Sequence, residues 1–316
     1  MKAIDFTTIV TAGEALVEFV SNKKNINHDQ TVNYSGPYPS GAPCIFIDQV
    51  ARMGAKTEFV GCVGNDGFGR CLSQRLVEDK VGITYLNVDD NNSTGVAFVA
   101  YHDDGSRDFI FHLDNTAAIN FKTDLPLFEQ KNLVYHVSGS SLGNIKMRKH
   151  LYDAAKKVKL HGGKISFDPN VRPELFKDPE VKSIIYDLMD KCNCFLPSES
   201  DLSYLFPDLT EDQAIEKIQN IGVEVIGLKK GAVGSSVIKG SERFNYKGHS
   251  VEEIDPTGAG DCFCGTFVSL YYQGYSVQEA GKFANAAGAL AVTKLGPMEG
   301  NSSLKQIEEF LKTDQN

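Results

Sequence analysis

Short apolar runs alternate along the chain with segments whose apolar positions recur at helical intervals. The runs at 9–12 and 58–63 have the length of buried strands. Between them, residues 45–53 repeat apolar positions with a helical period that stops at Gly54. Further strand-like runs follow at intervals that leave room for a helix, at 133–137, 164–167, 194–196 and 225–228. This alternation predicts an α/β fold, with a mostly parallel central sheet and helices on both of its faces.

Two segments break this alternation. Residues 21–35 are polar and have no helical period, and 94–113 contains two β-like runs around a turn at 102–105. An Asp-Gly turn between alternating runs is typical of a β-hairpin. We therefore expect one domain over 1–316, with a small β-sheet lid formed by about 21–35 and 94–113. A sheet that helices leave uncovered needs another surface, either a ligand or a second subunit, and we expect a homodimer through the lid.

Bulk properties narrow the range of functions. A chain of 316 residues can bury the core of one large domain, and its formal net charge of −9 argues against non-specific binding to nucleic acid or acidic membranes. No stretch approaches the roughly 18 apolar residues of a membrane-spanning helix. The first apolar run contains acidic residues, which indicates a strand and not a signal peptide, so we expect a cytoplasmic protein. The seven cysteines lack zinc-site spacing, and we interpret them as buried, reduced thiols.

The clearest chemical signal is the run at 255–261, Asp-Pro-Thr-Gly-Ala-Gly-Asp. Its small residues form a tight turn whose N–H groups can converge on an anion, and the positions that follow have a helical apolar period. A glycine-rich turn at a helix N-terminus is a ready site for phosphate. The carboxylate of Asp261 would repel a bound phosphate, but it suits a base that deprotonates a hydroxyl attacking that phosphate. The run therefore predicts phosphoryl transfer, whereas an isolated turn of this kind would indicate only a helix cap.

A longer pattern surrounds this run. The form D-x-T-G-A-G-D-x-F-x-G, with Phe263 and Gly265 in place, resembles the C-terminal signature of the ribokinase/PfkB family of carbohydrate kinases. Within the family, the runs 13–18 and 168–172 look most like the fructokinase and 2-keto-3-deoxygluconate kinase branch. Further segments that resemble the family occur in order along the chain, at 40–44, 60–69, 195–199, 228–234 and 283–296.

The resemblance implies a fold and a reaction. It implies a ribokinase-like (Rossmann-like) domain with a β lid, and ATP-dependent transfer of the γ-phosphoryl group to a primary sugar hydroxyl. By motif match, Asp261 is the general base, and the backbone amides of Gly258, Ala259 and Gly260 form the anion hole. The chemistry agrees, because fixed N–H dipoles stabilise charge on a transferring phosphoryl group without reorganising.

The resemblance also assigns residues to both substrates. We place Glu18 at the end of the first strand, Gly41 where the backbone approaches the substrate, and Arg107 on the lid. Residues 168–172 follow a strand, where α/β sheets bind ligands. Each of these residues has an alternative interpretation as a solvated side chain or a cap. The expected nucleotide-binding residues are Lys229, Gly231, Gly234 and Asn285, and the expected sugar-binding residues are Glu18, Gly41, Arg107, Asp168, Asn170 and Arg172.

Metal sites follow from the same resemblance. Relatives carry N-x-x-E for Mg²⁺ and phosphate, where this chain has Ser198-Glu199-Ser200-Asp201. Asp201 fits the acidic position and Glu199 offers another carboxylate, and Mg²⁺ needs few protein ligands because it keeps several waters. Asp255 has two interpretations: it either caps and pins the loop or, with Thr257, holds a monovalent cation such as K⁺.

The sugar site departs from the family pattern. Where the first signature usually has an asparagine that touches the sugar, this chain has Ile45, which cannot hydrogen-bond a hydroxyl. We expect a kinase of a ketohexose, fructose or a related ketose such as tagatose. A 2-keto-3-deoxygluconate kinase is the alternative, since Arg172 or Arg107 could pair with an acidic substrate. A nucleoside kinase is a weaker alternative, and Ile45 and Ser198 also allow a non-catalytic sugar or nucleotide sensor on a kinase fold.

Overall fold

Most of the chain surrounds one large sheet. The computed structural model describes residues 8–103, 106–172, 176 and 178–313. The strands of this sheet are β1 (Thr8–Ala12), β4 (Thr57–Gly64), β5 (Tyr85–Asp89), β8 (Leu133–Ser138), β9 (Lys164–Asp168), β10 (Cys194–Phe195), β11 (Val225–Lys229), β12 (Gly234–Lys239) and β13 (Glu242–Lys247). Their order is β13-β12-β11-β10-β9-β8-β1-β4-β5. The strands from β5 to β11 are parallel, and β12 and β13 are antiparallel additions at one edge.

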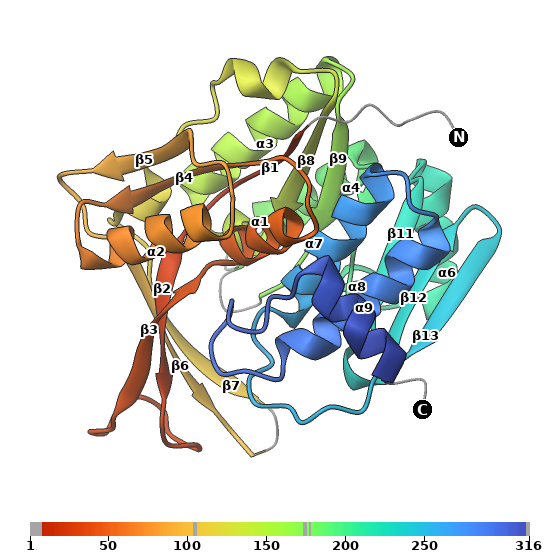
Figure 1. Cartoon of the computed structure of the whole chain (residues 1–316). Helices are drawn as coiled ribbons and strands as arrows, with labels where there is room; N and C mark the ends of the chain where they lie inside the picture. The colour runs from red at the N-terminus through yellow and green to blue at the C-terminus, as the bar shows by residue number, and fades with distance from the viewer. Residues whose placement is uncertain (1–7, 104–105, 173–175, 177, 314–316) are drawn as a thin grey trace.

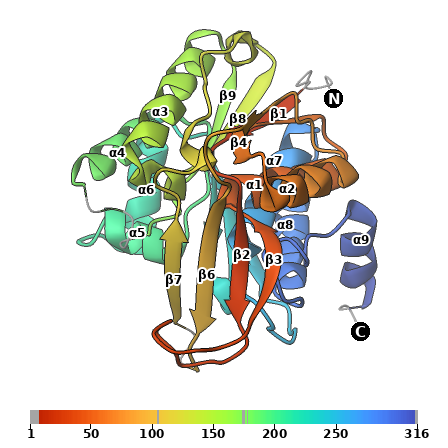
Figure 2. The same ribbon diagram turned by 90° about the vertical axis from the view of Figure 1, so that its left-hand side faces the viewer.

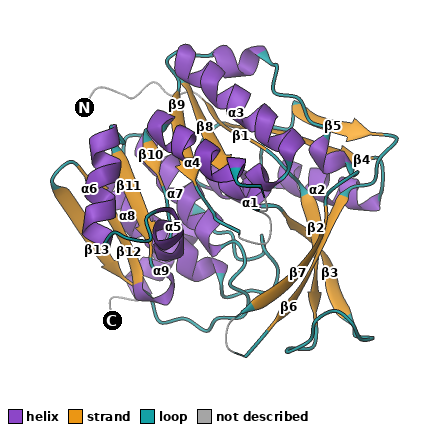
Figure 3. Cartoon of the chain, turned by 180° about the vertical axis from the view of Figure 1, so that it is seen from behind, coloured by secondary structure: helices purple, strands orange, loops and turns teal. Residues whose placement is uncertain are grey.

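Helices cover both faces of this sheet (Figure 1, Figure 3). They are α1 (Ala42–Arg52), α2 (Gly67–Glu78), α3 (Ile145–Leu160), α4 (Glu180–Lys191), α5 (Glu199–Leu205), α6 (Glu211–Ile221), α7 (Ala259–Tyr272), α8 (Val277–Ala291) and α9 (Leu304–Thr313). Successive residues of β1 belong to two separate hydrophobic clusters. Ile9 lies in the cluster that includes residues of α1, α2, α7, α8 and α9, and Val10 lies in the cluster that includes residues of α3 to α6. This period-two burial is what a parallel sheet covered on both faces requires, and it confirms the predicted α/β fold.

A separate four-stranded sheet stands out from the main body (Figure 2). Its strands, in order, are β3 (Tyr34–Ser40), β2 (Leu16–Ser21), β6 (Gly95–Tyr101) and β7 (Arg107–His112). Strands β6 and β7 fall within the predicted segment 94–113, and their predicted turn includes 104–105, which lie outside the described residues.

The first half of the small sheet differs from the sequence-based expectation. The predicted segment 21–35 is mostly a loop, and β2 and β3 flank it. Glu18 therefore belongs to β2 of the small sheet and does not end the first strand. The first strand stops at Ala12 because residues 13–15 interrupt it before β2 begins.

The cysteines and the helices agree with the composition. All seven cysteines are free, and all but Cys71 are buried, as predicted. Their side chains pack as small apolar groups, for example Cys62 in one hydrophobic cluster and Cys264 in the other. In the part of the chain that the structure describes, no helix is long and apolar enough to cross a membrane.

Candidate active site

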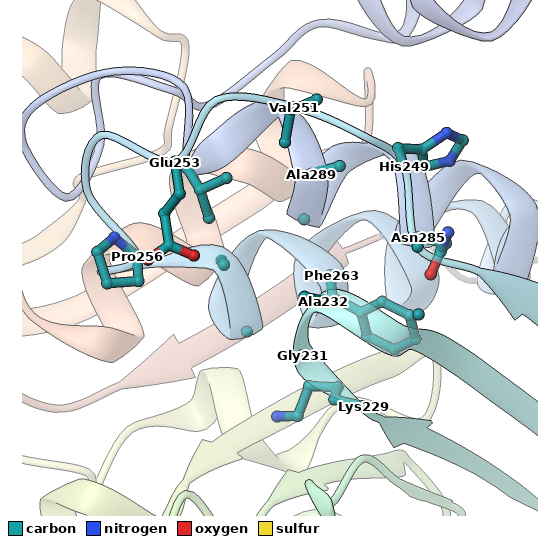
Figure 4. Close-up of a pocket in the computed structure, with 16 residues that line it drawn as sticks. Lys229, Gly231, Ala232, His249, Val251, Glu253, Pro256, Phe263, Asn285 and Ala289 are labelled. Atoms are coloured by element: carbon teal, nitrogen blue, oxygen red, sulfur yellow. The ribbon is translucent and has the colours of Figure 1, made fainter. Parts of the chain in front are cut away.

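Two cavities meet at the carboxyl ends of the central strands. The first has a volume of about 290 Å³ and lies among β11, α7, α8 and the loop at 248–256 (Figure 4). The second, of about 200 Å³, lies between the main sheet and the small sheet. Lys229, Pro256 and Gly260 line both, so the cavities adjoin there. All four residues predicted for the nucleotide line the first cavity, and all six predicted for the sugar line the second.

The N-terminus of α7 lies at this junction. Gly258 is its N-cap and adopts a φ of 85°, and a Cβ there would lie 2.4 Å from the carbonyl oxygen of Pro297. Glycine fits such a position because it carries no Cβ. The first N–H groups of a helix have no acceptor within the helix and carry the positive end of its dipole. Ala259 lines the first cavity and Gly260 both, so their N–H groups can bind an anion at the junction.

Asp261 follows directly in the first turn of α7 and lines the second cavity. The residue is only 9% exposed. Burial, and then the neighbouring Asp168 carboxylate, raise the pKa of Asp261 to about 7 against the opposing charges of Lys229 and Arg172. A carboxyl group whose pKa lies near neutral pH can take a proton from a substrate and release it again, as a general base must.

Acids and bases from both sheets line the second cavity. Glu18 comes from β2 and Arg107 from β7, while Asp168 ends β9 of the main sheet. Burial, followed by the charge of Asp255, raises the pKa of Glu18 to about 8. Burial lowers the pKa of Arg107, and the neighbouring Arg172 lowers it further. The cavity therefore combines a carboxyl group that protonates near neutral pH with two guanidinium groups that oppose each other's charge.

Glu14 is a polar lining residue that sequence reasoning missed. It follows β1 and accepts a hydrogen bond from the hydroxyl of Ser141, and its burial raises its pKa to about 7. Gly41 lies against the same backbone, since a Cβ at Gly41 would lie 2.6 Å from the carbonyl oxygen of Glu14. The glycine is thus required by the packing of the chain on itself as well as by access to the cavity.

The apolar wall of the second cavity comes from one face of β7 and from α1. Phe109 and Phe111 alternate with Arg107, so the three side chains share that face. Ile45, where relatives usually have asparagine, lines the cavity close to Gly258. Sequence reasoning missed the two phenylalanines, although the period-two pattern from 107 to 111 was a usable signal.

The first cavity is mainly apolar, with polar groups at its ends. Asn285 is buried on α8, where its Oδ1 accepts a hydrogen bond from Ser235 over 2.8 Å and its Nδ2 donates to the carbonyl of Lys247 over 2.9 Å. These bonds anchor the side chain to the β12–β13 edge of the sheet. Glu253 and His249 also line the cavity and were not predicted, because the loop that carries them has no regular pattern (Figure 4).

The two acids predicted to hold Mg²⁺ lie outside both cavities. Asp201 is buried at the start of α5, where its Oδ2 accepts hydrogen bonds from the N–H and hydroxyl of Ser198 and its Oδ1 accepts one from the N–H of Val171. The Ser-x-x-Asp sequence is thus a capping box, and Glu199 beside it lines a separate cavity between α5 and α6. Within the described ranges, no cluster of three or more His, Cys, Asp or Glu side chains is arranged to hold a metal ion.

Asp255 is fully buried just before the turn. Its oxygens accept hydrogen bonds from the hydroxyl of Tyr101 and from the N–H groups of Thr257 and Gly296, each N–H at 2.9 Å. These bonds tie β6 and the loop at 296 to the turn, which is the pinning role predicted as one of two interpretations. No ion pair of the Asp255 carboxylate is found among the residues that the structure describes.

The paired cavities and the fold have counterparts among known proteins. The family model described as pfkB family carbohydrate kinase matches residues 7–304. The chain belongs to this family. A fructokinase from Vibrio alginolyticus is 30% identical to this carbohydrate kinase over 281 residues, which cover 86% of this chain and 91% of the relative. The chain is therefore a phosphotransferase that acts on a sugar.

Two solved structures extend the likeness to the whole fold. An Escherichia coli protein provisionally named ribokinase II, in complex with ATP and Mg²⁺, has a TM-score of 0.91 at 40% identity and covers 97% of this kinase and 99% of its own chain. A fructokinase from Vibrio cholerae O395, bound to fructose, ADP and calcium, has a TM-score of 0.82 at 27% identity, with coverage of 97% and 99%. These likenesses confirm the ribokinase-like arrangement of a main sheet with a small separate sheet.

Proposed function

We propose that this carbohydrate kinase transfers the γ-phosphoryl group of ATP to a primary hydroxyl of a ketohexose, fructose or a related ketose such as tagatose. The observation that carries the proposal is the junction of two cavities at the N-terminus of α7, where free amides adjoin a buried carboxyl group. ATP occupies the first cavity and the sugar the second. The fructokinase relatives support the choice of acceptor.

In the proposed reaction, the turn and the carboxyl group act on the two reacting oxygens. Asp261 accepts the proton of the attacking hydroxyl, and the amides of Gly258, Ala259 and Gly260 stabilise the charge on the transferring group. One preorganised donor of this kind contributes roughly 3 kcal/mol, and a general base contributes roughly 10²–10⁴-fold. The two effects need a common geometry, which one turn of one helix provides.

Replacement of the base tests the proposal. We expect Asp261→Asn to lower turnover at least ~100-fold while ATP binding stays nearly intact, because the amide keeps the shape but cannot accept the proton. ADP release with ATP and Mg²⁺ is measured over a panel of free ketoses, sugar acids and nucleosides, and ATP binding by calorimetry. Asp190→Asn, on the exposed side of α4, is the matched control. Near wild-type turnover of Asp261→Asn would overturn the assignment, and no ADP with any acceptor would favour a non-catalytic sensor.

A second acceptor class is favoured by one observation. Arg107 and Arg172 line the same cavity closely enough that Arg172 lowers the pKa of Arg107. An anionic substrate group between them would relieve this repulsion, as in a 2-keto-3-deoxygluconate kinase. We expect Arg172→Ala to abolish activity with such an acid, if the acid is the substrate, and to spare activity with fructose. Equal losses with both acceptors would remove this alternative.

Mg²⁺ enters the proposed reaction with the nucleotide. Asp201 and Glu199 stay the proposed protein contacts of this ion, and because Asp201 also caps α5, they would act through the water molecules that Mg²⁺ retains. The ion supplies charge neutralisation of the β- and γ-phosphates, and the residues of the chain orient the two substrates around it.

We further propose a monovalent cation, K⁺, beside the turn. Asp255 is completely buried and without an ion pair among the described residues, and an uncompensated buried carboxylate is costly. A cation held by Asp255 and Thr257 would balance that charge next to the anion hole. We expect turnover to rise with potassium concentration in buffers that lack sodium, measured against tetramethylammonium as the inert cation. Turnover that is flat with potassium would count against the site.

The small sheet supports a proposed homodimer. On the face of β7 opposite Arg107, Ile110 is 39% exposed. On β6, which pairs with β7, Phe98 packs edge to face against Tyr34 of β3 across the sheet, with ring centroids 5.4 Å apart. Two copies of this sheet packed together would cover such apolar surface. Light scattering at micromolar concentration that gives the mass of one chain would contradict the proposal.

A further inference from the structure

Lys229 lies at the boundary between the two cavities. It ends β11, its side chain is 14% exposed, and it lines both cavities. Among the described residues, it is the only charged side chain that lines both. Its amino group also adjoins the N-terminus of α7, since a Cβ at Gly260 would lie 3.6 Å from Lys229 Nζ. Figure 4 shows this nitrogen pointing away from Asn285 and so away from the α8 side of the first cavity.

Two neighbours hold this amino group in place. The carboxylate of Asp168 forms an ion pair with Lys229 Nζ, and Sγ of Cys264 lies 3.6 Å from the same nitrogen. Although burial disfavours its charge, Asp168, Cys264 and Asp201 raise the pKa of Lys229, so the group is a cation at neutral pH. An ammonium group has three donors, and no third acceptor is found in the part of the chain that the structure describes.

We propose that Lys229 is a catalytic residue whose ammonium group contacts the γ-phosphoryl oxygens as that group passes from the first cavity to the second. Asp168 is the positioning residue that holds the ammonium at the crossing. The inference rests on the proposed function and deepens it, because it adds a positioned side-chain cation beside the amides of Gly258–Gly260. The phosphoryl group would then be held between two sets of donors throughout its transfer.

The step balances without any change in Lys229. The bond between the γ-phosphorus and the bridging oxygen of ATP breaks, and its electron pair leaves with ADP. A bond forms between that phosphorus and the acceptor hydroxyl oxygen, whose proton passes to Asp261. Lys229 donates hydrogen bonds to the equatorial oxygens, where the charge of the transition state is spread, and keeps its own protons.

The adjacent lysine supplies a matched control. Lys230 Nζ binds both carboxylate oxygens of Glu211, at 2.8 and 2.7 Å, and Lys230 lines neither cavity. If Lys229→Met loses activity and Lys230→Met does not, the loss is therefore due to the position of Lys229 at the junction of the cavities and not to the positive charge of this segment.

We expect Lys229→Met to lower kcat at least ~100-fold, the effect of removing one preorganised donor from a transition state. The Kd of ADP, measured by calorimetry, stays within threefold, because ADP lacks the group that Lys229 contacts. Lys230→Met keeps kcat within threefold of wild type. Lys229→Gln, which can still hydrogen-bond Asp168, is expected to lose as much as Lys229→Met, and it decides the question if the methionine variant fails to fold.

The acidic limb of the pH–rate profile tests whether the charges of Lys229 and Asp168 act on the base. Lys229 lowers the pKa of Asp261 and Asp168 raises it. Residual activity of Lys229→Met should therefore fall off at higher pH than in wild type, and that of Asp168→Asn at lower pH. Limbs that stay at the wild-type pH would contradict the placement of this ion pair beside Asp261, whereas the loss of kcat at an unchanged Kd of ADP separates the catalytic role from a structural one.

The outcomes distinguish this inference from the proposed function. If Asp261→Asn is inactive while Lys229→Met and Lys229→Gln keep near wild-type activity, the inference is overturned and the proposed function stands. A loss of kcat matched by an equal loss of ADP affinity would assign Lys229 to nucleotide binding alone and also overturn it. Wild type without activity on any sugar would overturn the proposed function itself.

Discussion

Asp261 shows how one environment can prepare a carboxyl group for proton transfer. Burial raises its pKa to about 7, and the nearby Asp168 adds to that shift. Because the base acts only when deprotonated, we expect kcat/KM to rise with pH up to about pH 7 and then to level off. Glu14 and Glu18 titrate in the same cavity, so the limb reports the group of acids as a whole.

Initial-rate measurements from pH 5 to 9, at saturating ATP and varied ketose, test this limb. Residual activity of Asp261→Asn should lack most of it, and Asp190→Asn should keep it unchanged. A limb near pH 4, the ordinary range of an aspartate, would show that the carboxyl group that matters is not a buried one.

At the scale of residues, site residues that are adjacent in the sequence were predictable. Site residues that only the fold brings together were predictable in part. The run at 255–261 carries its turn, its helix and its carboxylate in one stretch, so the sequence alone was sufficient to find it. Glu14 was missed because its place in the cavity depends on distant neighbours, Gly41 against its backbone and Ser141 at its side chain. The cap that Asp201 forms was readable from the sequence, since Ser-x-x-Asp is a capping pattern, and its role toward Mg²⁺ stays a prediction.

At the scale of elements, the close contact between α1 and α7 requires glycine at one position of α7. A Cβ at Gly265 would lie 2.8 Å from the carbonyl oxygen of Phe46 and 2.9 Å from Cβ of Gln49. We expect Gly265→Ala to destabilise the fold by about 1–3 kcal/mol, because the helices must separate to admit the methyl group. This loss exceeds the gain of up to about 1 kcal/mol in helix propensity.

Thermal and urea unfolding measure this effect against Gly67→Ala. Gly67 begins α2, and a Cβ there would meet only the end of the Arg70 side chain, at 3.9 Å. That control is expected to be neutral or slightly stabilising. If the two alanine variants are equally stable, α1 and α7 can separate enough to admit the methyl group without a loss in the free energy of unfolding.

The strands and helices of the main domain were predictable because the apolar residues within each one follow a local pattern in the sequence. Ile9 and Val10 face opposite clusters, and a run buried on both sides is what such a strand shows in sequence. The small sheet was harder to delimit. Residues 13–15 interrupt the chain with Gly13 as their one breaking signal, so β1 and β2 look like one strand until β2 is seen to pair with β3 and β6.

At the scale of the whole molecule, the fold concentrates buried acids where two sheets and a helix meet. Glu14 and Glu18 come from the start of the chain and Asp261 from its last quarter, and all three have pKa values raised to about 7 or 8. No local pattern predicts this, since each shift depends on burial by elements that are far away in sequence. The arrangement suits a site that must bind hydroxyl groups and release protons, and it has a cost in stability.

That cost sets the sign of the pH dependence of folding. The pKa of Glu18 is about 8 in the folded protein against 4.5 ordinarily. Between these values the folded state holds a proton that the unfolded chain releases, so stability falls as pH rises, by up to about 1.4 kcal/mol per pH unit for one group. Buried His136 has a lowered pKa and acts in the opposite direction, mainly below its ordinary value of 6.5.

The window from pH 6.5 to 8 therefore isolates the acids. We expect the free energy of unfolding of wild type, from urea titrations, to decrease across this window and that of Glu18→Gln to decrease less, because the amide cannot titrate. Glu252→Gln, on an exposed loop, controls for the loss of one negative charge. If Glu18→Gln and wild type show the same slope, Glu18 is ionised in the folded protein throughout, and the second cavity then presents a full negative charge to its substrate. Such a cavity would favour a neutral sugar over an acidic one, so the slope bears on the acceptor as well as on the fold.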